Sequence, residues 1–241
     1  MNHHTATHRK VGSFLKLALC SVALGTAICA NPAAAGTFTL QSPGVVLPEQ
    51  DSRVAFNVKN EGESPMLLVT KLADLDDGNF AGRVLVAPPV TRIDPGQSQQ
   101  VNFILKKGPA LDREVMLKAS FEGVTQQSEK SGMVFPVRQD VGFMIQPAAV
   151  PKVSDPWRDL EVSASASELV LHNPGKHVIR LGRSLTLKPS GQVVNLDGAY
   201  VMPGATKRTP ITSQPTTLGI VPLSRYGFTL DPVELPVAAV N

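Results

Sequence analysis

The sequence predicts an all-β protein made of short antiparallel strands, and three observations support this prediction. Apolar and polar residues alternate with a period of two in several stretches, which is typical of strands with one buried face. Twenty prolines and 19 glycines among 241 residues disfavour long helices. No window of about 12 residues carries a helical apolar stripe. Short strands separated by frequent turns indicate a β-sandwich or a β-barrel.

Residues 1–35 are expected to be a cleaved signal peptide, so the mature chain starts near Gly36. Basic residues precede an apolar stretch at 17–30, and the small residues Ala33, Ala34 and Ala35 follow it. The apolar stretch is shorter than the roughly 20 residues of a membrane-spanning helix, so no membrane insertion is expected. Removing residues 1–35 takes away three of the 23 basic residues, none of the 20 acidic residues and both cysteines. The mature chain is therefore neutral and cannot form disulfides.

The first half of the mature chain contains the clearest strands. Alternating apolar residues predict strands at 54–58, 101–105 and 115–121. Turn sequences such as Asn60-Glu61-Gly62 and Asp94-Pro95-Gly96 separate them. We interpret residues 36–147 as the first domain.

Residues 133–145 are predicted to form one long strand with an apolar face that only Gln139 interrupts. Met133, Phe135 and Val137 begin this face. Pro136 cannot donate to a β-ladder, which indicates a sheet edge or a bulge. An apolar row on an edge strand either binds another molecule or covers the core of its own sandwich. Periodicity alone favours the second interpretation.

A proline-rich stretch at residues 148–156 is predicted to be a linker, because prolines cannot sit inside a sheet. Shorter apolar runs follow, at 169–171, 178–181, 185–187, 193–196 and 218–221. Turn sequences such as Pro189-Ser190-Gly191 separate these runs. Residues 157–241 are therefore expected to form a second, smaller β-sandwich.

The residues that most enzymes need are scarce. The mature chain has only two histidines, His172 and His177, which flank a turn, and it has no cysteine. No serine lies in a Gly-x-Ser-x-Gly elbow, and the acidic residues around Gly78 lack the spacing of a calcium loop. Basic residues are scattered rather than clustered. We expect no catalysis, no metal, no cofactor and no nucleic-acid binding.

Several motifs occur together in the mature chain. They are the run at residues 87–101 with its Pro88-Pro89 and Asp94-Pro95-Gly96-Gln97, the triplet Asp112-Arg113-Glu114, the long strand that ends in Gln146-Pro147, and the weaker matches Leu171-His172-Asn173-Pro174 and Val201-Met202-Pro203-Gly204. Together they resemble the periplasmic pilus chaperones of the chaperone–usher pathway, the PapD-like family. The resemblance extends over nearly all of the mature chain.

The resemblance implies two immunoglobulin-like sandwiches in a boomerang arrangement. It implies a periplasmic chaperone of a Gram-negative bacterium that binds exported pilus subunits and delivers them to an outer-membrane usher. Such a chaperone lends an edge strand to a subunit that lacks one, a process called donor-strand complementation. Met133, Phe135 and Val137 match the lent side chains.

The sequence departs from the family where most members hold the carboxylate of the subunit's C-terminus. The family's arginine and lysine correspond to Gly44 and Gly142 here, and neither side chain can bind a carboxylate. We consider Arg138, Arg92 and Arg53 as alternative anchors. An arginine at the domain junction has become Gln146, which puts the usual ion pairing between the domains in doubt. These losses suggest a divergent branch of the family.

One alternative comes from a different class of function. The chain could be a secreted structural or adhesive surface protein with the apolar strand packed inside and no chaperone activity. A free chaperone, in contrast, is expected to associate with itself to cover its apolar edge.

Overall fold

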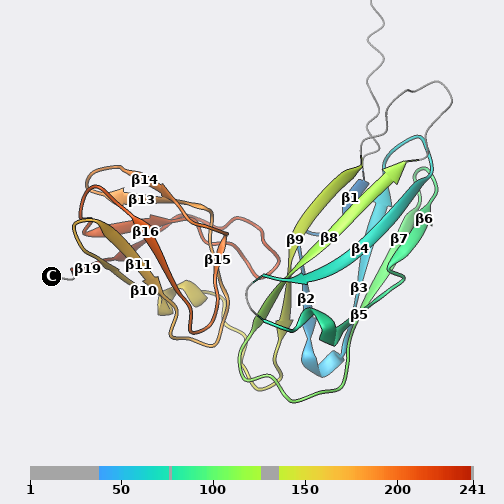
Figure 1. Ribbon diagram of the computed structural model, residues 1–241, viewed down its shortest axis with the longest axis horizontal. Coiled ribbons are helices and arrows are strands. Elements are labelled where there is room, and N and C mark those ends of the chain that lie inside the picture. The colour runs from blue at the N-terminus through green and yellow to red at the C-terminus, as the bar shows by residue number, and fades with distance from the viewer. Residues whose placement is uncertain (1–37, 76–77, 126–135, 240–241) are drawn as a thin grey trace, which may run out of the picture. The chain divides into compact units, whose positions relative to one another are not determined.

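The computed structural model of the protein describes residues 38–75, 78–125 and 136–239 (Figure 1). The predicted signal peptide lies outside these residues, and so do Met133 and Phe135. The described residues belong to one compact unit. In the described part of the chain, no helix has both the length and the apolar character needed to cross a bilayer.

The first sandwich consists of two facing sheets. One sheet has the order β1-β3-β7-β5 and the other the order β2-β9-β8-β4-β6. Two single 3₁₀ turns, η1 (Glu49–Asp51) and η2 (Ala81–Arg83), lie between strands. The strands are β1 (Phe38–Leu40), β2 (Gly44–Pro48), β3 (Arg53–Asn60), β4 (Met66–Asp74), β5 (Val84–Ala87), β6 (Val90–Ile93), β7 (Ser98–Leu105), β8 (Val115–Thr125) and β9 (Val137–Gln146).

Aromatic side chains from both sheets meet in the core of this sandwich. The rings of Phe56 and Phe121 stack at 5.3 Å, and the ring of Phe103 lies 4.9 Å from that of Phe143. All four phenylalanines are buried. They lie on β3, β7, β8 and β9, so the alternation that predicted strands at 54–58, 101–105 and 115–121 is confirmed.

The chain changes sheets near its start. β1 pairs with β3 in an antiparallel manner, whereas β2 pairs with β9 in a parallel manner. The expected long strand begins at Val137, and Pro136 is not part of it. Proline lacks the N–H that a ladder position needs, so the boundary is physically reasonable.

The second sandwich follows a 3₁₀ turn, η3 (Pro156–Asp159). Its sheets have the orders β16-β11-β10-β19 and β14-β13-β17-β18, and β12 pairs with β15 beside them. Leucine and isoleucine side chains such as Leu171, Leu187 and Ile179 fill its core. The strands are β10 (Glu161–Ala164), β11 (Glu168–His172), β12 (Ile179–Arg180), β13 (Ser184–Lys188), β14 (Val193–Asn195), β15 (Tyr200–Val201), β16 (Thr206–Pro210), β17 (Thr217–Ile220), β18 (Val233–Pro236) and β19 (Ala238–Ala239).

Strands form the regular structure of both sandwiches, and the all-β prediction is confirmed. The boomerang arrangement of the two sandwiches stays a prediction.

Candidate functional site

Strand β9 is flanked on both sides only in its second half. Residues 142–146 pair with β8 on one side and with β2 on the other, whereas residues 137–141 pair with β8 alone within the described chain. Half of the backbone N–H and C=O groups of residues 137–141 therefore have no ladder partner there. We call residues 137–141 the open edge (Figure 1).

The inward face of the open edge continues the core of the first sandwich. Val137 and Val141 are partly buried and pack against the core cluster. Gln139, which interrupts the apolar face, donates from Nε2 to the carbonyl oxygen of Phe38 at 2.8 Å. The polar residue thus connects β9 to the start of β1. Val137 helps to cover the core of the first sandwich, as expected if the apolar face packs against its own domain. It also lies on an edge that has no neighbouring strand among the described residues.

Gly44 and Gly142, which the resemblance aligns with anchoring cations, lie side by side where the open edge ends. Gly44 of β2 is paired in register with Gly142 of β9. A Cβ at Gly44 would lie 2.6 Å from the carbonyl oxygen of Tyr226 and 3.1 Å from Nη1 of Arg180. A Cβ at Gly142 would lie 2.6 Å from Cε of Met116 and 3.0 Å from Nη2 of Arg180. The side chain of Arg180 thus fills the space beside both glycines.

Arg180 extends from β12 of the second sandwich, and only 8% of its surface is exposed. Its Nη1 donates to the carbonyl oxygen of Arg225 at 2.9 Å, whereas its buried Nε has no hydrogen-bond partner among the described residues. No carboxylate in the described chain forms an ion pair with Arg180. Burial lowers the pKa of the Arg180 guanidinium, because desolvation disfavours its charge.

The three arginines predicted as anchors lie elsewhere. Arg138 lies on β9 four residues before Gly142, about 13 Å along a strand, and binds Asp140 at 2.8 Å. Arg92 lies on β6, which β8 and β4 separate from β9, and pairs with Asp94 at 2.9 Å. Arg53 lies on β3 in the opposite sheet and binds Asn102. The structure brings none of them to the glycine pair.

An ion pair does connect the two sandwiches, through residues other than Gln146. The buried carboxylate of Glu114 accepts the N–H of Val178 at 2.8 Å and lies 3.0 Å from Nη2 of Arg225. The N–H of Glu114 donates to the carbonyl oxygen of Lys176 at 2.8 Å. Burial raises the pKa of Glu114, although the bond from Val178 and the charge of Arg225 oppose the rise.

Gln146 instead organises the chain after β9. It is buried, and its Nε2 donates to the carbonyl oxygen of Val150 at 2.8 Å. Position 146 therefore carries a neutral side chain that holds the backbone at Val150 by a hydrogen bond.

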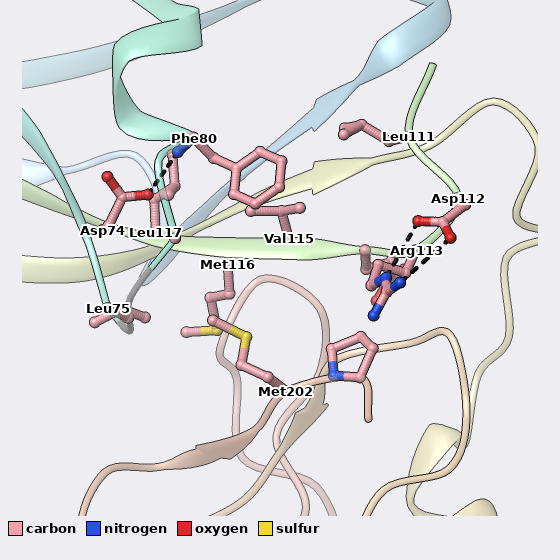
Figure 2. A pocket seen from close by; sticks show the side chains of 13 residues that line it. Asp74, Leu75, Phe80, Leu111, Asp112, Arg113, Val115, Met116, Leu117 and Met202 are labelled. Carbon is pink, nitrogen blue, oxygen red and sulfur yellow. Dashed lines mark hydrogen bonds and ion pairs between the residues drawn. The ribbon is translucent and has the colours of Figure 1, made fainter. Parts of the chain in front are cut away.

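A pocket of about 370 Å³ opens beside β8 (Figure 2). Met116 and Met202 line it from the two sandwiches, and the exposed pair Asp112–Arg113 lies at its rim. Asp74 also borders the pocket, but its carboxylate accepts the N–H of Phe80 at 2.8 Å and that of Ala81.

The two histidines are half-buried and hold local structure. Nδ1 of His172 lies 2.9 Å from Oγ1 of Thr206, and Nε2 of His177 donates to the carbonyl oxygen of Pro151 at 2.7 Å. Between them, the side chain of the buried Asn173 accepts the N–H of Gly175, which closes the turn. The described residues contain no cluster of three or more residues that could hold a metal.

Comparison with known proteins shows what kind of chain carries this edge. Residues 37–151 match the family of pili and flagellar-assembly chaperones, in its PapD N-terminal domain. The fimbrial chaperone YhcA of Escherichia coli K12 is 31% identical over 186 residues, which cover 76% of this chain and 83% of YhcA. The chain belongs to the pilus-assembly chaperone family. Pilus-assembly chaperones are not enzymes, and those of the chaperone–usher pathway act in the periplasm.

Solved pilus-assembly chaperones share the fold. The CupB2 chaperone of Pseudomonas aeruginosa matches with a TM-score of 0.69 and 19% identity, over 83% of this chain and all of CupB2. The structure of the Salmonella enterica SafA pilin in complex with the SafB chaperone matches with a TM-score of 0.71 and 19% identity, over 83% of this chain and 96% of the matched one. This likeness confirms the prediction of two immunoglobulin-like domains.

Sequence reasoning did not identify Arg180, Arg225 or the role of Glu114. One signal for Arg180 was present, because it is a cation inside the apolar run at 178–181. Glu114 belongs to the triplet that carried the family resemblance, but nothing in that triplet indicates a partner in the second sandwich.

Proposed function

We propose that this pilus-assembly chaperone binds exported subunits in the periplasm by lending them the open edge, and that it then delivers them to an outer-membrane usher. The proposal rests on the pairing of β9, which among the described residues has a neighbouring strand on both sides at residues 142–146 but on only one side at residues 137–141. Residues 137–141 offer backbone groups that have no ladder partner among the described residues, and the sequence extends their apolar face through Phe135 and Met133.

The chemistry of such an edge suits a partner that lacks a strand. Main-chain hydrogen bonds to the unpaired groups supply affinity, and alternate side chains fill successive pockets of the partner. In the complex, Val137, Phe135 and Met133 would be covered by apolar surface instead of water.

The test is recovery of subunits with tagged chaperone from a periplasmic extract, identified by mass spectrometry. Replacing Met133, Phe135 and Val137 together by serine should abolish recovery while the chaperone still folds. A matched control replaces Leu67, Leu85 and Val193, three exposed apolar residues on other strands, and should recover subunits like the wild type. Equal recovery by wild type and edge variant would refute the proposal.

Export from the cytoplasm is part of the same proposal. Cleavage after residue 35 should give a mature chain that starts at Gly36, and mass spectrometry of the periplasmic protein measures this directly. A protein found instead in outer-membrane polymers would favour the alternative of a structural or adhesive surface protein.

A further inference from the structure

We propose that Arg180 is the anchor for the C-terminal carboxylate of the bound subunit. This assignment rests on the proposed function, because it concerns the same open edge. It gives the second sandwich a direct part in holding the subunit, at the place where the side chains of Gly44 and Gly142 cannot bind an anion.

The geometry of β9 fixes where a partner strand must stop. A strand that pairs with residues 137–141 cannot continue past Gly142, because β2 occupies that side of β9 from Gly44 onward. A partner running parallel to β9, as β2 does, therefore has its C-terminal end beside Gly142. The guanidinium of Arg180 lies at this point, 3.0 Å from the Cβ position of Gly142.

The state of Arg180 in the free protein points to an anion. A guanidinium has five N–H donors, and a buried charge is stable only when it is paired. Among the described residues, the side chain of Arg180 has one hydrogen bond, to the carbonyl oxygen of Arg225, and no carboxylate partner. Its Nε–H is buried and unsatisfied. A chain-end carboxylate would supply both the missing charge and the missing acceptors.

The surrounding backbone holds the guanidinium in place. Because Gly44 and Gly142 have no side chains, the guanidinium lies directly against β2 and β9. Gly227, in the loop after Arg225, allows a similarly close approach. Gly227 has a φ of +93°, and its Cβ position is 2.8 Å from Nη2 of Arg180. A planar fork held in a fixed orientation suits a carboxylate better than a flexible ammonium would.

The experiment compares two synthetic peptides, each with the last ten residues of the subunit recovered in the test above. One peptide ends in a free carboxylate and the other in an amide. The wild-type chaperone should bind the acid about tenfold or more tightly than the amide, because a charge-assisted hydrogen bond to the carboxylate is lost in the amide. Isothermal titration calorimetry measures both dissociation constants.

Variants assign the preference to Arg180. The preference for the acid should vanish in Arg180→Gln and persist in Arg92→Gln, which removes an exposed arginine on β6, away from the open edge. Arg180→Lys should retain part of the preference, which guards against a folding defect in the glutamine variant. Thermal unfolding of each variant checks its folding.

The outcomes separate the anchor from the edge. Equal affinity of the wild type for acid and amide, or a preference that survives in Arg180→Gln, would refute Arg180 as the anchor. Edge donation would still hold if the triple serine variant at Met133, Phe135 and Val137 recovers no subunits. Recovery of subunits by the triple serine variant would instead refute the proposed function.

Discussion

The pair Gly44–Gly142 leaves room for a charged side chain from another part of the chain. Nη1 of Arg180 lies 3.1 Å from the Cβ position of Gly44, and its Nη2 lies 3.0 Å from that of Gly142. The second sandwich therefore supplies a positive charge at this point, from β12. Sequence reasoning aligned positions 44 and 142 with cations of the family, but it could not find Arg180 beside them, because contacts between residues so distant in sequence arise only on folding.

The first prediction concerns Gly44. Gly44→Ala should destabilise the protein by about 1–3 kcal/mol, because the new Cβ would lie 2.6 Å from the backbone oxygen of Tyr226, which cannot rotate away. Urea unfolding measures the change. Gly82→Ala serves as the control, since its Cβ would meet only Oδ1 of Asn79 at 3.8 Å. If Gly44→Ala lowers the free energy of unfolding no more than Gly82→Ala does, Gly44 is not closely packed against Tyr226.

At the scale of elements, alternation predicted the long strands and little else. β3, β7 and β8 each bury one row of side chains against the opposite sheet, so the sequence pattern directly reflects their environment. β1 and β2 are short, and β2 is buried along most of its length, so neither shows a clear period. Their pairing with different sheets depends on tertiary contacts that no local pattern encodes.

Gln139 gives a prediction at this scale. Gln139→Ala should cost about 1 kcal/mol of stability, because it removes the hydrogen bond from β9 to the carbonyl oxygen of Phe38. Gln100→Ala, at an exposed position on β7, should change stability little. Urea unfolding of both variants provides the comparison, and equal effects would show that Gln139 does not hold β1.

At the scale of the whole molecule, the contact between the two sandwiches depends on a buried acid. Glu114 binds the backbone of Val178 and pairs with Arg225, so its charge state affects both sandwiches. Because burial raises the pKa of Glu114, the folded protein takes up a proton at higher pH than the unfolded chain does. The stability that this carboxyl contributes is therefore greatest in acid and is lost as pH rises through the raised pKa.

A variant isolates this pH dependence. The stability of the wild type relative to Glu114→Gln should increase as pH falls from 7 to 5, measured by urea unfolding at each pH. The exposed Glu63→Gln is the control, against which the wild type should show no such increase. A difference between wild type and Glu114→Gln that stays constant with pH, or decreases in acid, would refute the role of burial.

Amide hydrogen exchange can follow the loan of residues 137–141 of β9 to a subunit residue by residue. In the free chaperone, the amides of residues 137–141 that point away from β8 should exchange quickly, whereas those of residues 142–146 that point to β2 should be protected. Adding the purified subunit should slow exchange at the open edge and leave residues 142–146 unchanged. Exchange at residues 137–141 that remains fast in a saturated complex would refute strand donation by β9.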